Sequence, residues 1–316
     1  MATYDSIITT DSLGDSGIIP PKYATDIIKN TPKSSVLLTR GRTLTMSSRT
    51  RTQPVLNLFP AAYWVDGDTG IKQTTEQQWK GLTITAEELA VIVPIPDAII
   101  ADSEIDLWAE ITPNLSEAFG IKIDQAGIFG TDAPDSWPTG IVPAAIAAGN
   151  TVTEGTADDL AGDVALMGQQ LAEEGFNLSD FACAPGFDWR LRGLRSTDGV
   201  PIYQTSLSGA ETSGLYGKSL NPVDNGAWDA TTATLLGGDF SNFLVGIRSD
   251  ISYKWLDQAV ISDDDGKVVL NLAQQDCTAL RVVMRVGFQV ANPITRLAED
   301  EDTRYPASVL VPAVAV

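Results

Sequence analysis

The stretch SEIDLWAEITPNLSEAFGIKIDQAGIFG, residues 103–130, predicts the longest helix of the chain. Its apolar residues recur at steps of three and four, which places them along one stripe of a helix. They are Ile105, Trp108, Ile111, Leu115, Phe119, Ile123 and Ala126. Ser103 with Asp106 resembles a capping box at the start, and Gly130 ends the helix. Pro113 predicts a kink, because a proline inside a helix removes a backbone hydrogen bond.

Strands are predicted before this helix. Residues 82–93 alternate between apolar and polar side chains with a period of two, which indicates a half-buried strand. Pro94 and Pro96 end it, because proline lacks the N–H that a strand ladder needs. Residues 60–81 contain an Asp-Gly turn signal and read as a long hairpin.

Short elements are predicted after the helix. Residues 131–140 are a proline- and glycine-punctuated linker. Thr156 and Asp159 form an N-cap pair for a second helix, which runs to about Glu174 and is closed by Gly175. The sequence does not show whether the apolar tail, residues 309–316, is ordered. The predicted strands are 181–185, 220–223, 233–236, 243–247, 268–272 and a long one at 279–290.

Composition excludes several classes of enzyme. The length of 316 residues suggests two domains, and the hydrophobic share of 43% is enough for a packed core. The absence of histidine excludes Ser-His-Asp and Cys-His nucleophile pairs and histidine-ligated metals. Two cysteines are too few for a four-cysteine zinc site.

Charge is unevenly distributed. The 21 Lys and Arg against 41 Asp and Glu give a net charge of −20, which disfavours tight binding of nucleic acid. Residues 27–65, however, contain six basic residues and no acidic residue. A solvated loop is the simple interpretation. We favour an extended arm that lies on the acidic surface of another copy, with burial or backbone pairing added because an exposed ion pair contributes only about 0–1 kcal/mol.

Two motifs suggest chemistry, and each has a simpler interpretation. Residues 212–219, TSGLYGKS, end like a phosphate-binding loop, but Thr212 stands where that motif requires glycine. We interpret them as a loop leading into a strand. Three consecutive aspartates, 263–265, fit a hairpin turn better than a calcium loop, which needs acids at alternate positions. We predict no catalytic, cofactor-binding or metal-binding residue and no enzymatic activity.

The N-terminal residues lack the pattern of a signal peptide, and no apolar stretch approaches the roughly 20 residues needed to cross a bilayer. We therefore expect a soluble protein made in the cytosol, without a membrane partner.

A series of short motifs resembles, in order, the tailed-bacteriophage major capsid proteins of the HK97-like fold. The resemblance covers the chain from about Ser12 to Ala298. The motifs are Ala62-Tyr63-Trp64-Val65, Leu89 to Pro96, Ile123 to Gly130, Pro138-Thr139-Gly140-Ile141, Trp189-Arg190-Leu191-Arg192, Leu215-Tyr216-Gly217, Gly238-Asp239-Phe240 and Arg285-Val286-Gly287-Phe288.

The resemblance implies an α+β fold in five parts. Residues 1–59 would be an N-terminal arm and residues 60–81 an extended β-hairpin loop lying across a neighbouring subunit. Residues 82–140 would form a peripheral domain with a long spine helix, and residues 141–248 an axial domain. Residues 249–316 would supply return strands of the peripheral domain and the C-terminal tail.

The same resemblance implies a structural protein of the virion. It would assemble in the host cytoplasm into the pentamers and hexamers of an icosahedral shell that encloses double-stranded phage DNA without reading its sequence. Its partners would be many copies of itself, a portal and, in some members, a scaffolding or decoration protein. No cofactor is implied. The subunit-interface candidates are Arg40, Arg42, Arg49, Arg51, Trp64, Lys72 and Trp79.

Two departures from the family pattern carry expectations. No long helical scaffolding segment precedes the arm, so we expect a separate scaffold or none. Some members crosslink a lysine of the extended loop to a neighbour's asparagine. Lys72 and Lys80 lie in that loop, but residues 282–285 contain no activating glutamate, so we expect non-covalent assembly.

Two alternatives remain at this point. An encapsulin-type nanocompartment shell has the same fold but encloses a cargo enzyme. An acidic hydrolase that uses two carboxylates belongs to a different class and would be a small species with a cleft.

Overall fold

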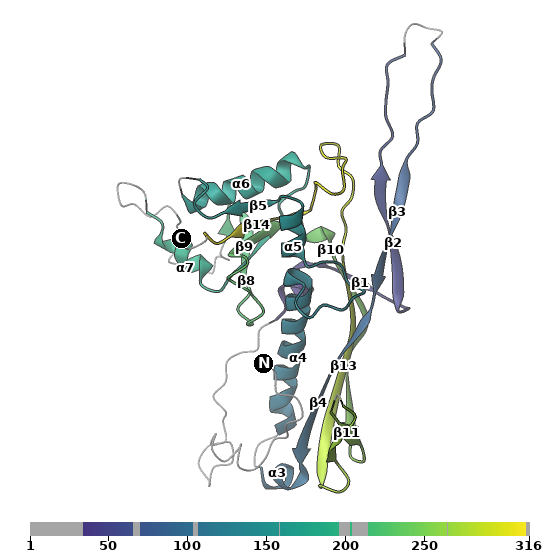
Figure 1. The fold of residues 1–316 in the computed structure, drawn as a ribbon, viewed down its shortest axis with the longest axis vertical. Helices are drawn as coiled ribbons and strands as arrows, with labels where there is room; N and C mark the ends of the chain where they lie inside the picture. The colour runs from purple at the N-terminus through teal and green to yellow at the C-terminus, as the bar shows by residue number, and fades with distance from the viewer. Residues whose placement is uncertain are drawn as a thin grey trace. The chain divides into compact units, whose positions relative to one another are not determined.

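The structure is a computed structural model that describes residues 34–65, 70–103, 107–157, 159–195, 203, 214–263 and 265–313 (Figure 1). Its contacts divide the chain into two compact units. Unit 1 contains Glu88–Phe119 and Ser249–Val286, and unit 2 contains Ser34–Glu87, Gly120–Arg248 and the residues from Gly287 onward. Three elements, α4, β10 and β13, run through both units.

Unit 1 is built on long strands that one helix covers. Strands β10 (Phe243–Leu256) and β13 (Cys277–Val290) are the central strands of a four-stranded sheet of order β1-β10-β13-β4. Leu115 and Phe119 of α4 (Leu107–Asp124) pack on Leu280 and Val282 of β13. The remaining elements of this unit are β4 (Glu87–Pro96), α3 (Asp97–Asp102) and the small pair β11 (Val260–Ser262) and β12 (Val268–Asn271).

Unit 2 is built on a six-stranded mixed sheet of order β5-β14-β9-β6-β8-β7. Its strands are β5 (Thr151–Thr153), β6 (Asp180–Cys183), β7 (Gly214–Leu215), β8 (Lys218–Pro222), β9 (Leu235–Gly238) and β14 (Ala307–Val311). Helices α5 (Ile141–Ala147) and α6 (Leu160–Glu173) both pack on β14. The unit also contains α7 (Phe187–Gly193), η2 (Phe240–Asn242), α2 (Val36–Arg40) and β1 (Arg42–Thr45), which pairs with residues 244–247 of β10.

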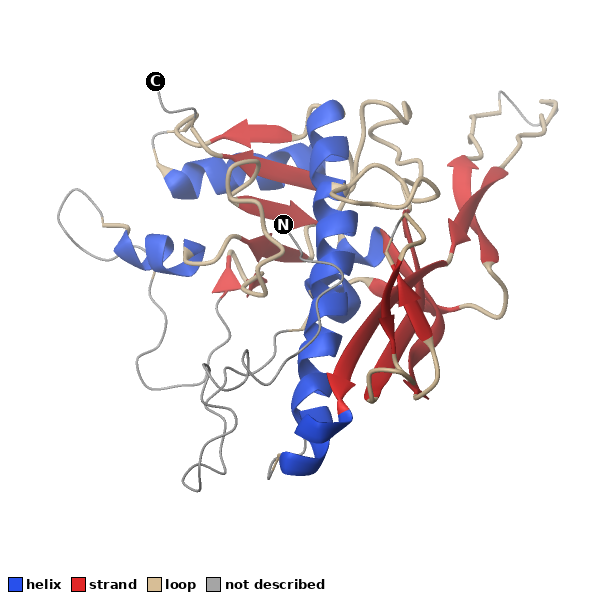
Figure 2. Cartoon of the chain, turned by 60° about the horizontal axis from the view of Figure 1, so that its bottom comes forward, coloured by secondary structure: helices blue, strands red, loops and turns tan. Residues whose placement is uncertain are grey.

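The hairpin of unit 2 lies partly outside the predicted range. Strands β2 (Thr50–Leu58) and β3 (Gln78–Thr85) pair antiparallel from Thr50↔Thr85 to Leu58↔Gln78. Residues 60–81, predicted to be the hairpin, are therefore mostly the connection, which Figure 2 draws largely as loop. The turn signal that was used, Asp66-Gly67, lies outside the described residues. Alternation in residues 50–58, not the turn alone, decides where the strands pair.

The single strand predicted at residues 82–93 is in fact two strands. A break at Ala86 separates β3 from β4, and the buried Ala86 donates its N–H to the carbonyl of Arg49 at 2.8 Å. Strand β4 also continues through Pro94 to Pro96. It is the edge strand of its sheet, so a missing N–H can point away from the ladder without cost.

The long helix is described from Leu107 onward and changes its winding near the end. Ser103 ends α3 by donating its N–H to the carbonyl of Ile99, and Asp106 lies outside the described residues. Helix α4 continues through Pro113 and passes into a π-helical turn, η1 (Gln125–Phe129). Gly130 ends it with a φ of 72°, as predicted. Of the predicted N-cap pair of the second helix, Asp159 caps α6 by accepting from the N–H of Gly162, whereas Thr156 donates its hydroxyl to the carbonyl of Thr153.

Strand β14 was not predicted. Residues 307–311 lie between β5 and β9 and are almost entirely buried, so part of the apolar tail is a central strand of the six-stranded sheet. The strand has only five residues, and an apolar run of that length does not distinguish a buried strand from an exposed tail.

Candidate assembly surface

The connection of the β2–β3 hairpin exposes large apolar side chains. We call residues 59–65 and 70–77 the hairpin tip. Trp64 is fully exposed, Ile71 is 88% exposed, and Trp79 at the start of β3 is 63% exposed. A lone exposed apolar residue is ordinary on a protein surface. Three on one projecting segment are typical of a surface that another molecule covers.

The two arms of the hairpin tip are held together by polar contacts. The N–H of Ala61 donates to Thr75 Oγ1 at 2.9 Å. The hydroxyl of Tyr63 donates to the carbonyl of Gln73 at 2.9 Å and accepts from the N–H of the same residue. These contacts keep the arms side by side beyond the last strand pair, so the tip extends away from the six-stranded sheet of unit 2.

The base of the hairpin is attached to residues 289–301 at several points. The guanidinium of Arg296 lies 4.2 Å from the ring centroid of Phe59 and donates to the carbonyl of Pro60 at 2.9 Å. The ammonium of Lys80 lies 2.9 Å from the carboxylate of Glu301. Backbone contacts add to these, among them the N–H of Ile294 donating to Leu56. A two-stranded hairpin is marginal alone, so these attachments set its direction.

Arg49, a predicted interface residue, is bound within its own chain. Its Nη2 lies 3.0 and 3.1 Å from the two carboxylate oxygens of Glu87, and Ser136 Oγ donates to the same carboxylate at 2.9 Å. The hydrogen bonds from Ser136 and Arg49 lower the pKa of Glu87 below its ordinary value. This cluster fixes the junction between β3 and β4.

The other three arginines differ in how free they are. Arg51 donates to the carbonyl of Thr45 at 2.6 Å, and Arg40 lies 3.7 Å from Asp180. Arg42 is exposed and has no ion pair or side-chain hydrogen bond with any residue in the described part of the chain. Lys72 is likewise exposed and unpaired within the described ranges. Their role at subunit contacts stays a prediction.

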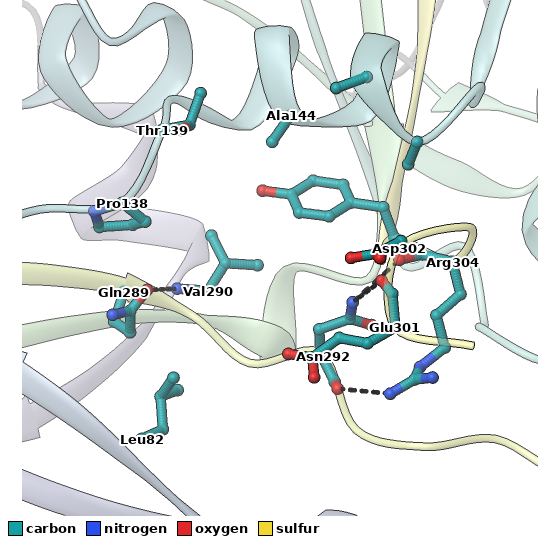
Figure 3. Close-up of a pocket in the computed structure, with 13 residues that line it drawn as sticks. Leu82, Pro138, Thr139, Ala144, Gln289, Val290, Asn292, Glu301, Asp302 and Arg304 are labelled. Atoms are coloured by element: carbon teal, nitrogen blue, oxygen red, sulfur yellow. Dashed lines mark hydrogen bonds between the residues drawn. The ribbon is translucent and has the colours of Figure 1, made fainter. Parts of the chain in front are cut away.

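An open groove of about 560 Å³ lies beside the hairpin base (Figure 3). It is lined by the apolar Leu82 and Pro138, by alanines of α5 and its C-cap, and by the acidic Glu301 and Asp302. The remaining lining residues are Thr139, Gln289, Val290, Asn292, Arg304 and Tyr305, and the alanines are Ala144, Ala147 and Ala148.

Two polar atoms in the wall of this groove lack a hydrogen-bond partner among the described residues. They are Asn292 Oδ1 and the hydroxyl of Tyr305, both buried. Burial raises the pKa of the Tyr305 hydroxyl, so it is protonated and can donate. The amide nitrogen of Asn292, by contrast, donates to the carbonyls of Glu301 and Arg304 at 3.2 and 2.9 Å. The polar atoms of this wall are therefore only partly paired within the described part of the chain.

The motifs that suggested chemistry are structural elements. Tyr216 and Gly217, both with positive φ, turn β7 into β8, so Gly217-Lys218-Ser219 leads into a strand as predicted. Asp263 accepts from the N–H of Lys267 across the β11–β12 turn. Within the described ranges, no three His, Cys, Asp or Glu side chains are grouped to hold a metal ion. None of the described helices is long and apolar enough to span a membrane.

Comparison with known proteins identifies the family. The model of the phage capsid family matches residues 16–295, which is most of the chain.

This chain belongs to the phage capsid family. It is 25% identical over 292 residues to the major capsid protein of Staphylococcus phage 80alpha, covering 87% of this chain and 82% of that one. A solved structure from Microbacterium phage Oxtober96 matches with a TM-score of 0.84 and 37% identity, covering 98% of this chain and all of that one. One from Mycobacterium phage Cain matches with a TM-score of 0.82 and 28% identity over 98% and 100%.

The family membership confirms the resemblance to phage capsid proteins and the α+β class. Sequence reasoning missed Arg296, Glu301 and the groove. Lys80 and Glu301 are 221 positions apart, and Arg296 and Pro60 are 236 apart. No spacing rule links residues so distant, so only the folded chain brings them together.

Proposed function

We propose that this chain is the major capsid protein of a phage, and that it assembles through its own copies into the pentamers and hexamers of an icosahedral shell around double-stranded DNA. The observation that carries the proposal is the hairpin tip with a fully exposed Trp64, on a chain that belongs to the phage capsid family. A monomer gains nothing from exposing such a side chain, whereas a partner surface gains about 25 cal/mol for each Å² of apolar area it covers.

In this proposal the five predicted parts keep their assignments. Residues 1–59 act as the arm, 60–81 as the extended loop, and 82–140 with the return strands of 249–316 as the peripheral domain around α4. The C-terminal tail within 249–316 contributes β14 to the six-stranded sheet. Residues 141–248 act as the axial domain. The seven interface candidates would lie at contacts between copies. Support comes from the contacts that hold the hairpin base, and from the interface candidates Arg42 and Lys72, which have no ion pair within the described part of the chain.

The acidity of the chain also supports a container. With a net charge of −20 per copy, a wall built from many copies does not hold DNA tightly, so a genome can be packed and later released. The virion would contain this protein together with a portal, and a scaffolding or decoration protein would act in addition where present. Assembly would take place in the host cytoplasm without covalent crosslinks.

The direct test is to express the full chain in a bacterial host and examine it by size-exclusion chromatography and electron microscopy. Closed particles made of this one chain are expected. Denaturing gels of these particles should show a monomer band alone. A stable monomer that never forms particles, with or without a scaffolding protein from the same phage, contradicts the proposal. A host enzyme found inside every particle would favour the encapsulin alternative.

A further inference from the structure

We propose that the groove beside the hairpin base receives the hairpin tip of a second copy, with Trp64 seated against α5 and Lys72 next to Asp302. The inference rests on the proposed function and adds to it the surface of the second copy that receives the hairpin tip. It is carried by complementarity in apolar character, in size and in charge between two parts of unit 2.

The groove has the chemistry of a socket for a bulky apolar group. Its volume of about 560 Å³ falls within the range of roughly 300–1,000 Å³ that holds a drug-sized molecule, so an indole ring and part of a neighbouring residue fit. Ala147 lines the groove and is exposed, and alanine leaves space that a larger side chain would fill.

The hairpin tip has the matching chemistry. Trp64 is fully exposed, and Ile71 is 88% exposed. An indole offers a large apolar face, which suits a groove lined by apolar side chains. Lys72 has no partner among the described residues. At the rim, Glu301 is already paired with Lys80, whereas the carboxylate of Asp302 has no ion-pair partner in the described part of the chain.

The tip does not reach the groove of its own chain. Leu82, which lines the groove, pairs with Gln53, and Trp64 is eleven residues further along the hairpin. At about 3.3 Å per residue the tip extends up to about 36 Å from that pair. The contacts between Tyr63 and Gln73 keep the two arms side by side, so the tip does not fold back. The occupant must be another copy.

A tip-in-groove contact joins two different surfaces of the same molecule. In an open chain such a heterologous contact leaves one free tip at one end and one free groove at the other, and both are occupied only when the copies close into a ring. Closure is the property that the capsomers of a shell require, so the contact would drive ring formation as well as hold it.

Disulfide trapping tests the contact directly. We would combine Trp64→Cys with Ala147→Cys, oxidise assembled particles and run denaturing gels without reductant. A ladder of covalent multimers that disappears on reduction is expected. The matched control combines Trp64→Cys with Ala172→Cys, an exposed alanine of α6 outside the groove, and should give no ladder. The native Cys183 and Cys277 are both buried and serve as the background in both variants.

Substitution tests the energetics. Trp64→Ala should raise the protein concentration needed for assembly at least tenfold, as expected for a buried aromatic anchor, and Trp64→Phe should fall between it and the wild type. Ala147→Trp, which fills the groove, should act like Trp64→Ala, whereas Ala172→Trp should not. Lys72→Glu should impair assembly, and adding Asp302→Lys should restore it.

The outcomes separate the two proposals. If the wild-type chain forms no particles, the proposed function fails. If particles form but the double variant with Trp64→Cys and Ala147→Cys crosslinks no more than the control variant, or Ala147→Trp assembles like the wild type, the groove is not the receiving surface and the inference is overturned. Because Trp64 and Ala147 are exposed, a folding defect does not explain either result; circular dichroism of the unassembled subunit checks this.

Discussion

At the scale of single residues, the buried carboxylate of Asp124 organises the middle of unit 2. It accepts from Ser35 Oγ at 2.6 Å, from the N–H groups of Val36 and Leu37 at 3.1 Å, and from Asn225 Nδ2 at 2.9 Å. A buried charge is costly unless hydrogen bonds replace its water, and here four donors do so. One side chain thus joins the start of α2, the end of α4 and the loop that contains Asn225.

Removing this carboxylate should cost more than removing an exposed one. Asp124→Ala leaves four donors without their acceptor, and each buried unpaired group costs about 1–3 kcal/mol, so we expect the free energy of unfolding to fall by about 3 kcal/mol or more. Asp132→Ala is the control, because Asp132 pairs with Lys122 at an exposed site, where such a pair contributes about 0–1 kcal/mol. Urea unfolding of the unassembled subunit measures both. Equal effects would contradict the structural role.

The same residue predicts a pH dependence. Burial raises the pKa of Asp124 above its ordinary value, so the folded state binds a proton more readily than the unfolded state. The stability from this group is present below the unfolded pKa, near 3.8, and is lost as pH rises through the folded pKa. As pH falls from 7 to 4, the wild type should therefore gain stability relative to Asp124→Asn, which has no titrating group at this position. Thermal denaturation across this range measures the shift, and a shift in the opposite direction would refute the assignment.

At the scale of elements, two glycines test how closely the backbones pack. A Cβ at Gly287 of β13 would lie 2.6 Å from the carbonyl oxygen of Thr85 in β3, and backbone does not yield as a flexible side chain does. At Gly168, inside α6, a Cβ would meet nothing within 4 Å. Gly287→Ala should therefore lower the thermal midpoint, by the equivalent of about 1–3 kcal/mol. Gly168→Ala should raise stability by about 0.5–1 kcal/mol, because alanine favours helix. If Gly287→Ala left the thermal midpoint unchanged, β13 and β3 could move apart enough to accept the Cβ, and the prediction would be wrong.

The attachment of the hairpin base makes a second prediction at this scale. Arg296→Ala removes the contact with the Phe59 ring and the hydrogen bond to Pro60, which together contribute about 1–2 kcal/mol at a partly exposed site. Amide hydrogen exchange in β3 should become several-fold faster, while exchange in β6 of the six-stranded sheet stays unchanged. Leu297→Ala, which removes an exposed neighbouring side chain, is the control. If exchange became faster in both variants, the effect would come from a general disturbance of residues 289–301, and the specific role of Arg296 would be contradicted.

Sequence reasoning worked for elements whose pattern is long or whose ends carry a cap. The apolar stripe of α4, the glycine end at Gly130 and the Asp159 cap of α6 were all readable. It failed where a pattern is short or where tertiary pairing decides. Strand β14 has only five residues, and the break at Ala86 depends on a backbone contact with Arg49 far away in the chain. The groove needs residues from four separate segments, which no local signal brings together.

At the scale of the whole molecule, the net charge opposes assembly, whereas the local basic segment was expected to favour it. Copies that each carry −20 repel one another, and the repulsion is screened over about 10 Å at 0.1 M salt. Assembly then depends on short-range contacts that outweigh it. The basic segment 27–65 was expected to supply them, but within the described residues Arg40, Arg49 and Arg51 already contact their own chain. Of the four predicted arginines, Arg42 is the one best placed to act between copies.

This distinction gives the last prediction. Arg42→Glu should raise the concentration needed for shell assembly without changing subunit stability, because Arg42 has no polar side-chain partner in the described part of its own chain. Arg49→Glu should lower stability as well, because it places a second carboxylate beside Glu87. Lys267→Glu, in the exposed β11–β12 turn, makes the same change in net charge and controls for general repulsion. Light scattering of assembly and urea unfolding of the subunit separate the three variants. If Arg42→Glu and Lys267→Glu assemble alike, then Arg42 acts only through net charge, and the basic segment makes no specific contact through it.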